Sequence, residues 1–214
     1  MPSSEVIVRR RFVCVVATLV GTALLALALS TPPGSPRFYP LGLAVALTWL
    51  VGALLAAPVR LAGPRAGAPT PPVVAGLLTG LALSAACALG VLVLARVGAV
   101  HEEVSSVIDL ARRGRLALVL PLAVLTGTAE ELFFRGAVYE ALPRGREVVL
   151  STVLYALVTM ATGNPMLVAA TVVLGLLTAR QRAVTGGVLA PVITHAVWTV
   201  CLVLVLPAVL DATA

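Results

Sequence analysis

Seven apolar segments, separated by short stretches rich in proline, glycine and arginine, make up most of the sequence. A helix that crosses a bilayer needs about 20 mostly apolar residues, and backbone polar groups inside the bilayer must be paired within helices or closed barrels. The composition agrees, because 60% of the residues are hydrophobic and only 11% are charged, whereas soluble domains are about half apolar and a quarter charged. We therefore predict an all-α, polytopic transmembrane helix bundle with about seven spans.

Turn-forming residues set the limits of the predicted spans, because proline interrupts a helix and Gly-Asn-Pro favours a turn. The spans are expected at Phe12–Ser30, Phe38–Ala57, Val73–Val97, Leu116–Leu142, Val148–Ala161, Pro165–Ala179 and Val188–Leu210. The third contains Gly76 and Gly80, a spacing that allows close helix packing but that is expected by chance in so Gly- and Ala-rich a chain. We predict two parts, residues 1–115 with the N-terminal transmembrane helices and an amphipathic connector, and residues 116–210 with the remaining helices.

The connector, residues 101–115, is the most polar stretch of the chain. Its acidic residues come early and its arginines come late, which suits the dipole of a helix. Its apolar residues recur at helical spacing, at Val104, Val107, Ile108 and Leu110. We predict an amphipathic helix at the membrane surface, and an ordinary solvated surface helix is the alternative.

Arginines in the short loops predict the orientation of the chain in the membrane. With a cytoplasmic N-terminus, the inner side would hold Arg9, Arg10, Arg11, Arg60, Arg65, Arg144, Arg146, Arg180 and Arg182, and the outer side Arg37, Arg96, Arg112, Arg113 and Arg115. The positive-inside rule favours this arrangement. We predict a multi-pass protein of the plasma membrane with its N-terminus in the cytoplasm. Membrane lipids are the expected partners of these arginines, and no feature of the sequence indicates nucleic-acid binding.

One short charged run lies inside the fourth segment, Glu130-Glu131-Leu132-Phe133-Phe134-Arg135-Gly136. An ionisable group near the bilayer centre costs about 3 kcal/mol on insertion scales, so such groups usually face the bundle interior and mark functional sites. The run therefore predicts an intramembrane active site or binding site. A buried ion pair that only stabilises the fold is the alternative interpretation.

Helical spacing gives the two carboxylates different surroundings. Glu131 and Arg135 are four residues apart and therefore share a helix face, so a charge pair there lowers the cost of burying either group. Glu130 is turned about 100° away and is expected to lack that partner. Two neighbouring carboxylates in a medium of low dielectric do not both ionise cheaply, and a carboxylate that titrates near neutral pH suits a general base.

His195 is the polar residue of the seventh segment that can join this site. It follows Gly186 by nine residues, which is about 13 Å along a helix, so it is expected at a depth similar to that of the carboxylates, on the cytoplasmic side of the midplane. A histidine from another helix would complete a water-activating or metal-binding site. A hydrogen bond to a neighbouring helix, without chemistry, is the alternative.

The pattern Glu130-Glu131-x-x-Phe134-Arg135-Gly136 resembles the first motif of the CPBP intramembrane proteases, which include the type II CAAX prenyl endopeptidases and the bacteriocin-processing or "Abi" proteins. In that family a second helix carries an aromatic residue followed four residues later by histidine. A later helix carries histidine followed four residues later by asparagine or aspartate. The stretch from Thr185 to His195 is similar as well, and the resemblance extends from Leu116 to Leu206.

The resemblance implies a role for each matching residue. Glu130 would activate water with Glu131 as its partner, Arg135 would hold the carboxylates or the fold, and His195 would bind a metal or stabilise the transition state. Family members are generally described as metalloproteases, which implies a zinc ion held by Glu130 and His195. A glutamate-centred mechanism without a tightly held metal is the alternative. Residues 116–210 would be the CPBP-like catalytic core.

Two positions depart from the family pattern. Thr159, four residues after Tyr155, stands where the family has histidine, and Thr199, four residues after His195, stands where it has asparagine or aspartate. Both threonines are retained as candidate catalytic residues. A threonine hydroxyl donates one hydrogen bond but is a poor base and a poor ligand for zinc.

The resemblance implies an intramembrane endopeptidase, a metalloprotease of the CPBP type, which hydrolyses a peptide bond near the cytoplasmic face. The glutamate pair would activate the water, and the substrate would be a peptide or protein. A catalytically silent CPBP-fold scaffold or peptide-binding protein is the alternative, and the two threonines favour it. A transporter would need a water-accessible path across the bilayer, whereas the few intramembrane charges cluster on one side.

Overall fold

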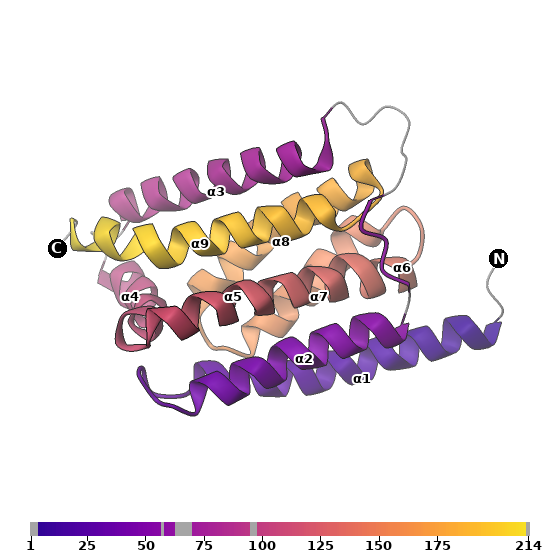
Figure 1. The fold of residues 1–214 in the computed structure, drawn as a ribbon, viewed down its shortest axis with the longest axis horizontal. Helices are drawn as coiled ribbons and strands as arrows, with labels where there is room; N and C mark the ends of the chain where they lie inside the picture. The colour runs from indigo at the N-terminus through magenta and orange to yellow at the C-terminus, as the bar shows by residue number, and fades with distance from the viewer. Residues whose placement is uncertain (1–3, 57, 63–69, 95–97, 213–214) are drawn as a thin grey trace.

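The computed structural model describes residues 4–56, 58–62, 70–94 and 98–212, and in this part of the chain it contains helices and no strands (Figure 1). The helices are α1 (Ser4–Leu29), α2 (Phe38–Ala56), α3 (Pro72–Leu94), α4 (Gly98–Arg113), α5 (Leu116–Glu131), η1 (Leu132–Val138), α6 (Tyr139–Ala141), α7 (Glu147–Met160), α8 (Pro165–Thr185) and α9 (Leu189–Asp211). Six stretches of the described residues are long and apolar enough to cross a membrane, and α7 is a shorter apolar helix. The predicted multi-pass helical bundle with about seven spans is thus confirmed.

The long helices lie roughly side by side, with α1 and α2 on one flank and α3 on the other (Figure 1). The α1 helix packs along α2, α2 packs on α5, α7 packs on α8, and α3 packs along α9. The N-terminus and the C-terminus lie at opposite ends of the bundle, as an odd number of crossings requires. The predicted division at residue 115 stays a prediction, because α2 and α3 both pack against helices of the C-terminal part.

Two helices are longer than the spans predicted for them. The α1 helix begins at Ser4 and includes the three arginines that the sequence placed before the span, because Arg10 is held by the carbonyl oxygens of Ala56 and Glu140, each at 3.2 Å. The α8 helix continues to Thr185 instead of ending near Ala179, because the buried side chain of Arg182 finds partners inside the bundle.

Some of the predicted features lie outside the described residues, namely Ala57 and Val97 as span ends and Arg65 and Arg96 in the orientation count. The remaining span limits agree with the helices to within a few residues. The α7 helix runs from Glu147 to Met160 and α9 from Leu189 to Asp211.

The predicted amphipathic connector is the α4 helix, which crosses one end of the bundle (Figure 1). Val104 and Ile108 are buried against Val91 of α3 and Leu210 of α9. The apolar stripe of this helix is therefore used for packing on the ends of two long helices. Asn164 links the turn before α8 to the same helix, since its side-chain amide donates to Glu103 O at 3.0 Å.

Two glycines of α3 allow a close contact with α9. A methyl group at Gly76 would lie 2.7 Å from Ile193 Cβ, and one at Gly80 would lie 2.8 Å from Val197 Cβ. The Thr194 hydroxyl also hydrogen-bonds Gly76 O at 3.1 Å. The glycine spacing that the sequence attributed to chance thus fixes α9, the helix that carries His195.

The core beside the charged run is aromatic. Trp49 of α2 stacks on Phe133 and Phe134 with ring centroids 4.9 and 5.3 Å apart, and Phe134 lies 4.7 Å from the ring of Tyr155. Phe133 and Phe134 are both fully buried although they are consecutive. This stretch is therefore enclosed on several sides, and the carboxylates just before it lie at the centre of the bundle.

The charged run does not continue as a regular α-helix. From Leu132 to Val138 the backbone widens into a π-helix, in which hydrogen bonds join residues five apart. The sequence predicted plain α-helical geometry through this region, which is wrong at these seven residues. Such widened turns are rare and recur at functional sites.

Candidate active site

The Glu131 carboxylate joins residues from two helices. Its Oε1 atom lies 3.0 Å from His195 Nδ1 of α9, and its Oε2 atom lies 3.3 Å from Arg135 Nε of η1. The predicted Glu131–Arg135 pair is therefore present despite the change to π-helical geometry. His195, 64 residues away in the sequence, contacts the same carboxylate, so the charged run and α9 meet as predicted, and the roles of these residues stay predictions.

Glu130 has a partner that helical spacing did not provide. The Tyr155 hydroxyl of α7 donates to Glu130 Oε2 at 2.5 Å. The sequence left Glu130 without a partner because only residues of its own helix were considered. Tyr155 was aligned with the aromatic residue of the family's second motif. Its hydrogen bond to Glu130 was not predicted.

Arg135 is fully buried beside Glu131. Its guanidinium carbon lies 4.7 Å from the centre of the Tyr155 ring, and a methyl group at Gly175 of α8 would lie 3.3 Å from its Nη2 atom. Within the described residues its N–H groups make no hydrogen bond. The Glu131 charge and the Tyr155 ring are therefore the contacts that offset the cost of burying this cation.

A second buried arginine holds the widened turn. Arg182 Nε of α8 donates to Arg135 O at 2.9 Å, and Arg182 Nη2 pairs with Glu140 at 2.5 Å. A π-helix leaves some backbone carbonyls without their α-helical partner, so this donor satisfies part of that loss. The sequence counted Arg182 only as a loop charge.

The imidazole of His195 lies against Gly127, one turn before the glutamate pair. A methyl group at Gly127 would lie 2.9 Å from both Nε2 and Cδ2 of the ring, which is closer than van der Waals contact allows. The lack of a side chain at Gly127 thus makes room for the histidine. Neither composition nor motif spacing identified this position.

Accessibility divides the four polar residues into two pairs. Glu131 and Arg135 have no accessible surface, whereas Glu130 and His195 keep 8% and 5% of theirs. The Glu131–Arg135 pair is therefore the more deeply buried of the two pairs, and it can orient the other two groups. All four residues are buried, and Glu130 and His195 are the two that keep some exposed surface.

The two threonines at the substituted motif positions are buried. Thr159 donates to Tyr155 O at 3.0 Å and accepts a hydrogen bond from the Thr171 hydroxyl at 3.2 Å. Thr199 lies one turn after His195 on α9. The Thr159 hydroxyl is therefore engaged with its own helix and with α8, and its predicted catalytic role stays a prediction.

The donor set does not fit the predicted zinc ion. Among the described residues no group of three or more His, Cys, Asp or Glu side chains could hold a metal, whereas protein zinc sites have three or four protein ligands. Glu130 and His195 would supply two, and His195 Nδ1 is turned toward Glu131. Zinc binding therefore stays a prediction.

Comparison with known families agrees with the position of this site. Residues 112–201 match the model of the Rce1-like family, described as type II CAAX prenyl endopeptidase Rce1-like. No curated protein and no solved structure matches the chain. The matched segment contains all four site residues, and the family is the one that the sequence motif predicted. Residues 112–201, less than half of the chain, are thus similar to the Rce1-like family.

Proposed function

We propose that this protein is an intramembrane endopeptidase that uses Glu130 to activate water. The observation that carries the proposal is the buried cluster of four ionisable groups, in which Glu131 contacts both Arg135 and His195 and Glu130 lies next to them in the chain. An ion pair that only stabilised the fold would need neither the second carboxylate of Glu130 nor the space that Gly127 leaves for the histidine.

In this mechanism, the Glu130 carboxylate takes a proton from water while the water oxygen attacks the carbonyl carbon of a peptide bond. The carbon–nitrogen bond then breaks, and Glu130 returns the proton to the leaving nitrogen. The Tyr155 hydroxyl, 2.5 Å from Glu130 Oε2, leaves the second carboxylate oxygen to face the water. General acid–base catalysis of this kind typically contributes about 10²- to 10⁴-fold in rate.

His195 would act on the oxygen of the scissile carbonyl. With Nδ1–H donated to Glu131, the ring is held in one orientation with Nε2 next to Gly127, and the substrate carbonyl would have to approach that nitrogen. A ring that carries a hydrogen on both nitrogens would offer Nε2–H to the developing oxyanion. Arg135 would keep Glu131 in place.

The substrate of the proposed enzyme is a peptide or protein that enters the membrane. We propose that the chain lies in the plasma membrane with its N-terminus in the cytoplasm, which puts the turn at α6 and the nearby end of the bundle on the cytoplasmic side. The matched family's description names CAAX prenyl endopeptidases, and a prenylated substrate is therefore one class to include in an assay.

The proposed function is tested with purified protein in liposomes and a set of membrane-inserted peptides, some prenylated. We expect cleavage at a bond near one membrane surface, with one oxygen of ¹⁸O-labelled water in the new carboxyl group. A zinc chelator in a parallel reaction tests the metal prediction separately. Absence of cleavage across the peptide set, with protein that remains folded, would contradict the proposed activity.

A catalytically silent peptide-binding protein is the second candidate, favoured by the engagement of Thr159 with Tyr155 O and Thr171. The double variant Thr159→His, Thr199→Asn restores the family residues at both positions. If the site is silent, cleavage appears only in the double variant. If the proposed enzyme is correct, the wild type already cleaves, and the measurement is the rate of both proteins in the same liposomes.

A further inference from the structure

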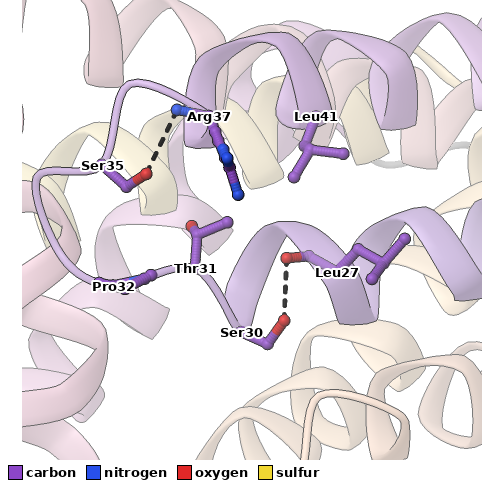
Figure 2. A pocket seen from close by; sticks show the side chains of 7 residues that line it. All are labelled: Leu27, Ser30, Thr31, Pro32, Ser35, Arg37 and Leu41. Carbon is purple, nitrogen blue, oxygen red and sulfur yellow. Dashed lines mark hydrogen bonds between the residues drawn. The ribbon is translucent and has the colours of Figure 1, made fainter.

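A pocket of about 440 Å³ lies where α1 ends and α2 begins (Figure 2). It is at the end of the bundle opposite the N-terminus and α6, next to α4 (Figure 1). Because α1 and α2 are both candidate spans, the loop that joins them lies at a membrane surface. The residues that line the pocket are Leu27, Ser30, Thr31, Pro32, Ser35, Arg37 and Leu41.

The polar part of this lining suits an anion. It contains no carboxylate, and Arg37 is its one charged residue. The carboxylates near this end of the bundle pair with other arginines, Asp109 with Arg113 and Asp211 with Arg112. No described residue forms an ion pair with Arg37, so its guanidinium is available for a ligand.

The hydroxyl groups of the lining are not equivalent. Ser30 donates to Leu27 O at 3.0 Å and Thr31 donates to Ala28 O at 2.7 Å, so both hydroxyl hydrogens are used by the end of α1. Ser35 Oγ instead accepts from the backbone N–H of Arg37 at 3.3 Å, which leaves its own hydrogen to donate. Arg37 and Ser35 are thus the two donors for an anion.

The rest of the lining is apolar and lies deeper in the membrane. Leu27 of α1 is 56% exposed, and Leu41 of α2 faces it across the pocket (Figure 2). A cation and a hydroxyl at the membrane surface above two leucines match a phosphodiester above an acyl chain. Free inorganic phosphate would occupy only the polar half of the pocket, at the membrane surface.

The loop that shapes the pocket packs against the turn between α4 and α5. Gly34 has a φ of +85°, and a methyl group there would lie 3.3 Å from Arg113 O. The Tyr39 hydroxyl accepts a hydrogen bond from the backbone N–H of Arg115 at 2.9 Å. The backbone of the loop that carries Arg37 and Ser35 is therefore held before a ligand arrives, which lowers the entropic cost of binding.

We propose that this pocket binds the phosphodiester headgroup of a phospholipid, with Arg37 and Ser35 on the phosphate and an acyl chain along Leu27 and Leu41. The proposal is independent of the proposed protease activity, because the pocket lies at the other end of α1 and α2 from the α6 turn.

The test measures lipid retained by the full-length protein in detergent micelles, by native mass spectrometry, with phosphatidylglycerol, diacylglycerol or inorganic phosphate added. We expect phosphatidylglycerol to bind most tightly, Arg37→Gln to weaken it roughly tenfold, as loss of a charged hydrogen bond does, and Ser35→Ala to weaken it less. Arg146→Gln, an exposed arginine in the α6–α7 turn, is the matched control and should bind as the wild type does.

Equal retention of phosphatidylglycerol by Arg37→Gln and wild type would overturn the proposal, as would equal retention of diacylglycerol. Binding of inorganic phosphate alone, with the same loss in Arg37→Gln, would identify an anion site and overturn the proposal that the ligand is a phospholipid. Thermal unfolding of each variant in the same detergent shows that it is folded. Arg37→Lys provides a second folded variant, expected to retain part of the binding because it keeps the charge.

Discussion

Glutamine at position 130 is expected to lower the rate of peptide cleavage by about 10²- to 10⁴-fold, the usual contribution of a general base. The amide keeps the size of the side chain and an oxygen that accepts the Tyr155 hydrogen bond, now 2.5 Å long. It cannot take a proton from water. The packing of Glu130 against α7 should therefore survive while the proposed chemistry is lost.

The measurement compares initial rates of the wild type, Glu130→Gln and Glu147→Gln in the same liposomes. Glu147 is a carboxylate in the first turn of α7 and lies outside the site, so its replacement controls for the loss of one charge. Thermal unfolding of the three proteins should differ little. Full turnover by folded Glu130→Gln would remove Glu130 from the mechanism and leave the fold assignment intact.

Alanine at position 127 is expected to lower cleavage by about 10²-fold, the loss that follows when a reacting group is misplaced by about 1 Å. The new methyl group would lie 2.9 Å from Nε2 and Cδ2 of His195, so the ring must tilt away or α9 must shift. Either movement disturbs the contact of His195 Nδ1 with Glu131, now 3.0 Å. Because the ring acts on the transition state, kcat should fall more than KM rises.

Gly90→Ala is the matched control for this substitution. Gly90 is also within a long helix, and a methyl group there meets no atom within 4 Å, so its activity should equal that of the wild type. Alanine is favoured over glycine in a helix by about 1 kcal/mol, so a loss at Gly127 would not come from helix propensity. Unchanged kcat in Gly127→Ala would show that the position of the imidazole does not limit the rate.

Much of the architecture follows from the sequence alone. The apolar segments predicted the helical membrane bundle, and the turn residues located its loops, because both signals are local and each span must satisfy its own backbone hydrogen bonds. The spacing of Glu131 and Arg135 predicted their ion pair for the same reason, and the depth argument placed His195 near them. The length of α8 was missed because Arg182 was expected to remain in water, and its buried partners lie on other parts of the chain.

The composition of the site was decided by tertiary structure. The Tyr155 hydroxyl reaches Glu130 from another helix, the widened turn brings six consecutive residues from Phe133 to Val138 into the core, and Gly127 and Gly175 leave room for His195 and Arg135. Hydropathy and spacing report which face of one helix is apolar. They do not report which atoms of a second helix contact that face, and those contacts determine which partner each carboxylate has.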